Sequence, residues 1–191
     1  MAVEGDAPGL VRQSMRTVDA TRPQGRLSFS AVGAELVVPA DAGPALDAGL
    51  DRAGILLAAE QLGTSQRALE MAVAYARERE QFGRPIGAFQ AIKHLCADMF
   101  VGIESLRSAV RAAAWAADSR APDRAALASV AQAIGSTVAA EVTDASQHVH
   151  GGIGFTWEHP AHLYVRRALG DAALFGRPEQ HLARLSDRVG L

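Results

Sequence analysis

The chain has 191 residues, of which 49% are hydrophobic and 21% charged, the composition of an ordinary soluble globular protein. Its net charge of −2 gives no reason to expect nucleic acid or an anionic membrane as a partner, and a single cysteine excludes an internal disulfide and a cysteine-based zinc site. The acidic N-terminus has no signal-peptide core and no long apolar run predicts a membrane span, so we expect a protein of the reducing cytoplasm.

Two β-leaning segments open the chain, at residues 11–19 and 25–39, and the turn-like stretch ATRPQG separates them. They predict two or three short strands, which are too few to form an independent sheet. We therefore expect them either to pair with strands outside this segment or to form a small flap on the helices that follow.

From Leu46 onward, apolar residues recur at steps of three and four, which is the period of an amphipathic helix. The first helix should bury Ile55, Ala59, Leu62 and Leu69, and Pro122 should lie in the first turn of the third helix. Three long helices and a shorter pair predict a mainly α fold, an up-and-down bundle whose excess apolar surface favours an oligomer. The expected helices are 47–80, 89–118, 122–149, 160–173 and 178–189.

The stretch REREQFGRPIGAFQ interrupts the helical pattern between the first two helices. Gly83 and Pro85 would end a helix in any protein, so an ordinary helix–loop–helix corner explains the stretch. The alternative is a site for a large anionic aromatic ligand, in which an arginine forks a phosphate, glutamines form hydrogen bonds and phenylalanines stack on a ring. The candidate binding residues are then Arg79, Gln81, Phe82, Phe89 and Gln90.

The second unusual segment is QHVHGGIGF, residues 147–155. Gly151, Gly152 and Gly154 would let the backbone approach a ligand closely, but no strand precedes them and the spacing is not GxGxxG. A plain connection between helices is the favoured explanation of this segment when it is considered alone.

Four histidines gather within 15 residues, namely His148, His150, His159 and His162. Neither a cysteine nor a well-placed carboxylate completes a ligand set, so we expect no metal site. A GxSxG element and a βαβ rhythm are also missing, which gives no support to a hydrolase or a classical dinucleotide fold.

Together, AAEQLGTSQRALEMAVAYAREREQFGRPIGAFQAIKHLCADM and HGGIGFTWEHPAHLYVRRA resemble the acyl-CoA dehydrogenase family. The resemblance covers roughly residues 45–190 and rests on two motifs in one chain, at the separation that the family shows. It implies that residues 1–42 are a remnant of the family's middle β-domain. Residues 43–191 would then form the C-terminal helical bundle domain.

The resemblance also implies FAD as the cofactor, held across a subunit boundary. Arg79 and Gln81 would face the pyrophosphate, and the glycine loop would approach the FAD of a neighbouring subunit. A family glutamine is replaced here by His148, an imidazole that can still donate one hydrogen bond. The implied cofactor-binding residues are Arg79, Gln81, Phe82, Ile86, Phe89, Gln90, His148, Gly151 and Gly152.

The reaction implied by the resemblance is α,β-dehydrogenation of an acyl-CoA thioester, in which a carboxylate removes the α-proton as the flavin takes a hydride. The catalytic base departs from the family pattern. Ala53 occupies the helical position of the base, and the other candidate, Glu179, lies eight residues after Asp171. Glu179 also suits the first turn of a helix, where a carboxylate interacts favourably with the helix dipole.

Two functional hypotheses follow from this pattern. The first is a flavin-dependent acyl-CoA dehydrogenase-like subunit that works only within a homo- or hetero-oligomer. The alternative is a truncated, non-catalytic paralogue that binds or scaffolds a full-length dehydrogenase. A weaker third hypothesis is an independent helical domain that binds another CoA derivative or nucleotide.

Overall fold

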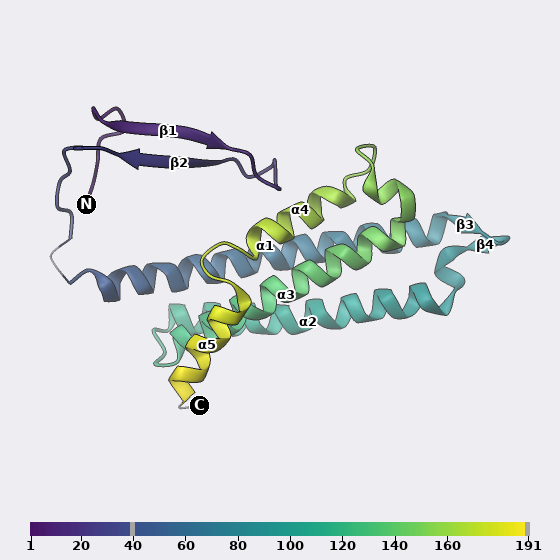
Figure 1. Cartoon of the computed structure of the whole chain (residues 1–191). Helices are drawn as coiled ribbons and strands as arrows, with labels where there is room; N and C mark the ends of the chain where they lie inside the picture. Colours follow the sequence, from purple (N-terminus) through teal and green to yellow (C-terminus); the bar gives the residue numbers. More distant parts are fainter. Residues whose placement is uncertain (39–40, 190–191) are drawn as a thin grey trace.

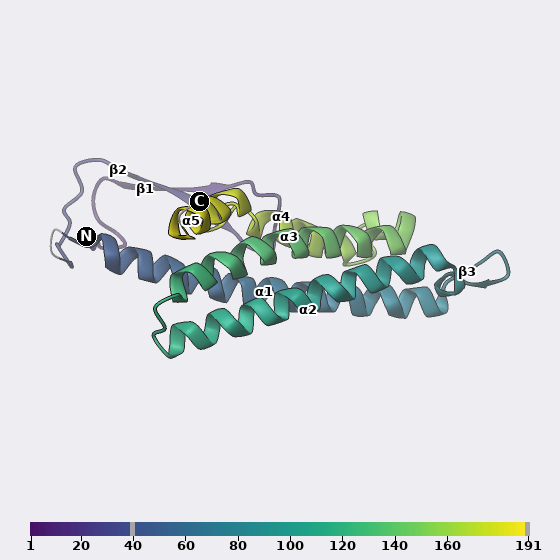
Figure 2. The same cartoon turned by 90° about the horizontal axis from the view of Figure 1, so that it is seen from below.

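The computed structural model describes residues 1–38 and 41–189, and helices dominate it. Three long helices run lengthwise through the bundle, and two short helices follow on one side of them (Figures 1 and 2). The mainly α fold predicted from the sequence is thereby confirmed. The helices are α1 (Gly43–Glu78), α2 (Gln90–Asp118), α3 (Arg124–His150), α4 (Ala161–Asp171) and α5 (Pro178–Val189).

Helix α3 is the centre of the bundle, because it packs against α1, α2, α4 and α5. Small residues allow the close approach: Ala58 of α1 is fully buried and faces Gly135 of α3. A Cβ atom at Gly135 would lie 3.4 Å from Ala58 and only 2.4 Å from the side-chain oxygen of Gln61. The two helices can therefore pack this closely only because Gly135 has no side chain.

Two details of the predicted helices are wrong. Ala59 is exposed, whereas Ala58 is buried, because the buried face follows the 3.6-residue period and shifts by one position from the predicted stripe. Pro122 lies in the turn before α3, whose first residue is Arg124, so the proline precedes the helix.

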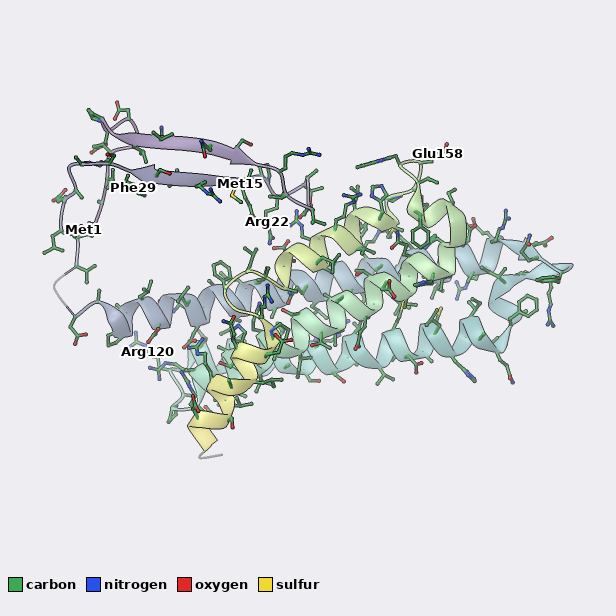
Figure 3. All side chains as sticks on the ribbon, viewed as in Figure 1. Met1, Met15, Arg22, Phe29, Arg120 and Glu158 are labelled. Carbon is green, nitrogen blue, oxygen red and sulfur yellow. The ribbon has the colours of Figure 1, made fainter. Side chains whose placement is uncertain are left out.

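The N-terminal segment forms a two-stranded antiparallel ribbon, β1 (Leu10–Met15) and β2 (Gln24–Phe29), in which Leu10 pairs with Phe29. The strands pack on each other, and Met15 and Phe29 remain exposed on the ribbon (Figure 3). Strand β2 ends at Phe29, well before the end of the predicted segment 25–39, and Pro39 lies outside the described residues. The two-domain division predicted from the resemblance stays a prediction.

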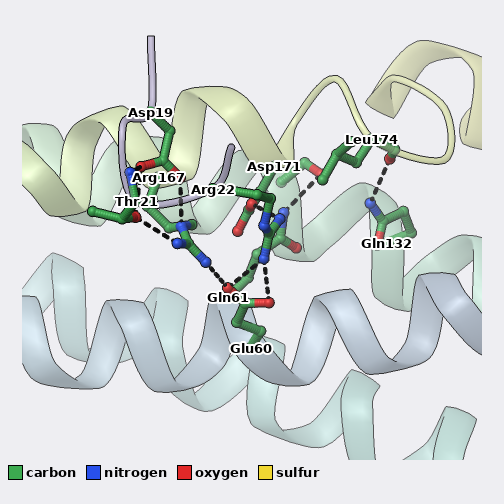
Figure 4. A network of polar contacts seen from close by, with 10 residues as sticks. Asp19, Thr21, Arg22, Glu60, Gln61, Gln132, Arg167, Asp171 and Leu174 are labelled. Atoms are coloured by element: carbon green, nitrogen blue, oxygen red, sulfur yellow. Dashed lines mark hydrogen bonds and ion pairs between the residues drawn. The ribbon is translucent and has the colours of Figure 1, made fainter. Parts of the chain in front are cut away.

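A network of charged side chains connects the ribbon to the bundle at the loop between β1 and β2 (Figure 4). From this loop, Arg22 contacts both carboxylate oxygens of Glu60 on α1 and one oxygen of Asp171 at the end of α4. Arg167 of α4 bridges Glu60 at 2.5 Å and Asp19 of the loop at 2.6 Å. Segments far apart in the sequence are thus held by ion pairs rather than by apolar packing.

Asp171 is the most buried member of this network. Its side chain is fully buried, and its second oxygen has no hydrogen-bond partner. Burial raises the pKa of Asp171 to about 6, although the guanidinium of Arg22 acts in the opposite direction. The network therefore contains a carboxylate that takes up a proton more readily than an exposed aspartate.

The stretch Arg124–Phe155, formed by α3 and the segment after it, is long and apolar enough to cross a membrane by length and composition alone. In the bundle, 56% of its most apolar window is buried against other helices. Burial of this kind is the property of a core helix, so the stretch is weak evidence for a membrane span.

Candidate functional site

A tight hairpin forms the corner between α1 and α2. Strands β3 (Glu80–Gln81) and β4 (Arg84–Pro85) pair through a two-residue turn, Phe82–Gly83. Both turn residues have positive φ, 54° and 74°, which is the geometry of a type I′ hairpin turn. The glycine adopts it without strain, and the phenylalanine is held there at a conformational cost.

The chain returns to the bundle through a short 3₁₀ helix, η1 (Ile86–Ala88). The nitrogen of Ile86 donates to the carbonyl of Arg79 at 2.8 Å, which closes the base of the hairpin. Gly87 lies so close to α1 that a Cβ atom there would be 2.9 Å from the carbonyl oxygen of Ala76. The breakers in this stretch therefore build a defined corner rather than a loose loop.

The glycine segment after α3 is a 3₁₀ turn, η2 (Gly151–Phe155), which begins at a positive φ of 61°. Its carbonyl at Gly154 accepts a hydrogen bond of 3.0 Å from the buried amide of Gln147. A Cβ atom at Gly154 would lie 2.8 Å from the carbonyl of Gln147 and 3.0 Å from Cβ of His150. The segment is thus packed firmly on the end of α3.

These two segments lie at the same end of the bundle (Figures 1 and 2). Residues from both segments line one groove. The groove has a volume of about 410 Å³. Its lining residues are Tyr75, Arg79, Gln81, Ile86 and the run 149–153. Five predicted cofactor-binding residues are therefore brought together, two from the glycine segment and three from the corner.

The groove presents one cation, one amide and a bare backbone. The Arg79 side chain is exposed and has no ion-pair or hydrogen-bond partner among the described residues. The Gln81 amide donates to the carbonyl of Glu80 at 2.8 Å, and no atom lies within 4 Å of a Cβ built at Gly151 or Gly152. Such a site suits a phosphate or pyrophosphate that a guanidinium and backbone N–H groups approach together.

Three other predicted residues of the corner lie beside the groove. Phe82 is 91% exposed at the tip of the hairpin, and its ring meets Phe89 edge-on at 6.1 Å between centroids. The guanidinium of Arg84 covers the Phe89 ring at 4.2 Å, and Gln90 is exposed as the first residue of α2. The exposed Phe82 ring and the edge-on Phe89 ring, of which Arg84 covers one face, form an apolar platform beside the hairpin that is not among the walls of the groove.

His148 lies on the outer face of α3 and does not line the groove. Its ring contacts Asp144 one turn earlier, at 3.4 Å, and meets Phe155 edge-on. The neighbouring Gln147 points inward instead, where it holds the glycine segment. An imidazole at position 148 therefore has a local partner on the surface.

The proposed base positions lie away from this groove. Glu179 is exposed in the first turn of α5, toward the other end of the bundle from the β3–β4 hairpin (Figure 1). Ala53 is half-buried in α1 and carries no ionisable group. The role of Glu179 as a base stays a prediction.

Sequence reasoning missed four groove residues, Tyr75, Val149, His150 and Ile153. Tyr75 lies on α1 four residues before Arg79, and this spacing puts both residues on the same face of the helix. The spacing could therefore have identified Tyr75 from the sequence. His150 directly precedes the first glycine, is only 2% exposed, and its ring lies 4.9 Å from that of Tyr75.

An alanine substitution at Gly154 tests how tightly the glycine segment is packed. Gly154→Ala is expected to lower the free energy of unfolding by about 1–3 kcal/mol, because its Cβ would overlap the end of α3. Gly152→Ala is the matched control and should change stability little, since nothing lies within 4 Å of its Cβ. Equal Tm values for the two variants would contradict this packing.

Comparison with known proteins identifies the family. The family model described as "Acyl-CoA dehydrogenase, C-terminal domain" matches residues 44–190. This chain belongs to the acyl-CoA dehydrogenase family. It is 41% identical to the acyl-CoA dehydrogenase IpdE2 of Mycolicibacterium smegmatis over 177 residues, which cover 93% of this chain and 52% of that protein. It is 49% identical to FadE34 of Mycobacterium tuberculosis over 138 residues, 71% of this chain and 19% of FadE34.

Solved acyl-CoA dehydrogenase structures share the fold over almost the whole chain. The Tcur3481–Tcur3483 steroid ACAD superposes with a TM-score of 0.90 at 37% identity, covering 98% of this chain and 50% of that one. The ChsE4–ChsE5 complex from Mycobacterium tuberculosis superposes with a TM-score of 0.87 at 29% identity, covering 98% of this chain and 51% of that one. This chain therefore spans about half the length of these family members.

Proposed function

We propose that this chain is a subunit of a flavin-dependent acyl-CoA dehydrogenase and holds the adenosine-diphosphate part of FAD in the corner groove. The observation that carries the proposal is the convergence of Arg79 and Gln81 with Gly151 and Gly152 on one groove. FAD supplies the hydride acceptor for α,β-dehydrogenation of an acyl-CoA thioester. The residues of this groove bind and orient the cofactor.

The donor set of the groove fits a pyrophosphate. Arg79 has a free guanidinium, and the bare backbone at Gly151 and Gly152 allows phosphate oxygens to approach closely. Ile86 and the Phe82–Phe89 platform provide apolar surface for the flat adenine ring. Charge and apolar surface are thus arranged side by side, as an adenine nucleotide requires.

We propose that another acyl-CoA dehydrogenase-like subunit completes the active site. The helical base position of this chain is Ala53, and Glu179 lies far from the groove along the bundle. The ribbon exposes Val11, Leu27 and Phe29 and leaves both of its outer edges unpaired among the described residues. A partner that covers the ribbon and contributes further domains explains these features, and the similar ChsE4–ChsE5 structure is itself a complex.

A non-catalytic scaffold is the alternative function, because Ala53 carries no acidic group at the expected helical base position. The two functions differ in flavin content. A subunit that contacts FAD should bind the flavin with an affinity that depends on Arg79, whereas a scaffold should bind no flavin alone and should leave the flavin content of its partner unchanged when Arg79 is replaced. The single cysteine supports a reducing, cytoplasmic setting in either case.

Arg79→Ala is expected to weaken FAD binding about 10- to 100-fold, the usual loss for a hydrogen bond to a charged group. Arg77→Ala is the control, because Arg77 is exposed in the last turn of α1 and does not line the groove. Quenching of FAD fluorescence on titration with protein gives Kd for each variant, with and without the partner. Equal Kd values for both variants would refute the assignment of Arg79.

A competition experiment shows which half of FAD the groove binds. ADP should displace FAD from the groove, and riboflavin, which lacks the adenosine diphosphate, should not. Release of FAD by riboflavin but not by ADP would contradict the proposed groove.

Once a complex with a partner subunit has been prepared, steroid-derived thioesters are the first substrates to assay, because this chain is 37% identical to a steroid ACAD.

A further inference from the structure

Three imidazoles form a connected cluster beneath the glycine segment. His150 ends α3, His159 precedes α4 and His162 lies in the first turn of α4. The rings of His150 and His159 lie 4.3 Å apart, and His150 and His162 are only 2% and 7% exposed. No set of residues suited to a metal is found in the described part of the chain, so the cluster needs another explanation.

The hydrogen bonds of two of these rings fix where their protons are. Nδ1 of His150 lies 2.7 Å from the carbonyl oxygen of Ser146, and since a carbonyl only accepts, Nδ1 carries the hydrogen. Nε2 is then a lone pair, buried and without a partner. Nδ1 of His159 accepts the backbone N–H of Ala161 at 3.2 Å, at the start of α4. The rings of His150 and His159 are therefore both held by backbone groups, the first as a donor and the second as an acceptor.

Among the described residues, the side chains found in ring contact with this cluster and with its neighbour Trp157 are aromatic or basic rather than acidic. Tyr75 of α1 contacts His150, and Arg79 lines the same groove. Arg166 of α4 lies over Trp157, whose ring meets that of His162 edge-on at 4.4 Å.

The acidic residues nearest in sequence do not face these rings. Glu158 is exposed, and Asp144 is paired with His148 on the outer face of α3. Burial lowers the pKa of His159, and charge on His150 and His162 lowers it further. At mildly acidic pH, His159 in this arrangement is therefore less protonated than an exposed histidine would be.

The cluster is connected directly to the proposed cofactor groove. His150 lines that groove, and the Cβ of a residue at 154 would lie 3.0 Å from its Cβ, so the glycine segment rests on this side chain. Displacing His150 would move the wall that contains Gly151.

We propose that His150, His159 and His162 form a pH-sensitive latch, which holds the glycine segment closed while His159 is neutral and releases it when His159 takes up a proton. Opening of the latch weakens binding in the corner groove, a consequence that rests on the proposed function. Protonation of His159 would also replace its acceptor with a donor that faces the N–H of Ala161, which loosens the start of α4.

The sign of the pH dependence follows from the lowered pKa of His159. An exposed histidine has a pKa of about 6.5, so the open state binds more protons than the closed state in mildly acidic solution. The stability of the closed state is complete above about pH 6.5 and is lost as the pH falls below that value. Uptake of one proton can weaken a linked binding equilibrium by up to about tenfold for each pH unit.

The latch is tested first without any cofactor. Amide NMR signals of Gly151, Gly152 and Gly154, and Trp157 fluorescence in a Trp115→Phe background, are followed from about pH 8 to about pH 5. We expect both to titrate together with a midpoint below about 6.5, while far-UV circular dichroism keeps the helical signal. Glycine signals that do not titrate, or that change only as the helices unfold, would overturn the proposal.

Matched histidine variants identify the group that is responsible. His159→Asn keeps an acceptor for the N–H of Ala161 but removes the imidazole, so the transition should be lost or shifted by more than about half a pH unit. His148→Gln removes an exposed imidazole outside the cluster and should leave the transition in place. An identical transition in His159→Asn and the native chain would also overturn the latch.

FAD binding then separates the latch from the proposed function. FAD is the probe because its pyrophosphate does not titrate in this range. Its Kd should rise up to about tenfold from about pH 7.5 to about pH 5.5 in the native chain, and less in His159→Asn. A glycine transition without FAD binding at any pH refutes the proposed function and supports the latch, whereas FAD binding with the same Kd at both pH values refutes the latch.

Discussion

Arg22→Ala is expected to lower the free energy of unfolding by about 3 kcal/mol at neutral pH, because it leaves a buried carboxylate without its partner. Arg22 is the only described cation that contacts Asp171 through a hydrogen bond, and Asp171 is fully buried. The same guanidinium pairs with Glu60, so its loss also removes the direct ion pair between the ribbon loop and α1. Chemical denaturation monitored by circular dichroism measures the effect.

Arg26→Ala provides the control for this variant. Arg26 is exposed on β2 and has no ion pair among the described residues, so its removal should cost less than about 0.5 kcal/mol. Comparable losses of stability in the two variants would show that the network does not anchor the ribbon.

Asp171→Asn should behave differently from Arg22→Ala. The pKa of Asp171 is raised to about 6, above its unfolded value of 3.8, so the folded protein binds the proton more tightly. The stabilisation from this group is complete below the unfolded pKa and is lost as the pH rises through about 6. Asparagine mimics the protonated form, so the variant should be at least as stable as the native chain near pH 7.5 and should lack this pH dependence.

Leu106→Ala is expected to destabilise the bundle by about 3 kcal/mol, the usual result of emptying a fully packed leucine site. Leu106 is completely buried within the hydrophobic core, on the inner face of α2. Removal of its side chain leaves a cavity that the long helices cannot close by a local shift. Thermal unfolding should show a clear decrease in Tm.

Leu56→Ala is the matched control, because Leu56 lies on α1 and is 72% exposed. This substitution should change stability by less than about 0.5 kcal/mol in the isolated chain. If a partner subunit covers this face, the same substitution should weaken the complex, which light scattering of the mixture measures. Equal destabilisation by the two substitutions in the isolated chain would contradict the assigned core.

The helices could be predicted from the sequence because their signal is local. Apolar residues at steps of three and four produced five helices, and α5 begins at Pro178 as predicted. The strands were harder to predict, since a two-stranded ribbon with both faces exposed has no alternating buried pattern. The hairpin at Phe82–Gly83 was missed because its turn contains a non-glycine residue at positive φ.

The candidate site was only partly predictable. The motifs supplied Arg79, Gln81, Gly151 and Gly152, but nothing in them distinguishes His148 from His150. Those histidines are two residues apart on one helix, so they point about 200° apart. The structure places His148 on the surface and His150 beneath the glycine segment.

By itself, the sequence determined the helical period, the two motifs and the chemistry of the groove, because each depends on residues close together in the chain. Only the tertiary structure decided that the corner and the glycine segment share one groove, that the rings of His150 and His159 meet beneath the glycine segment and that Arg22 reaches Asp171, 149 positions later. Contacts of this kind depend on how α1, α3 and α4 pack against one another, and no local pattern specifies that packing.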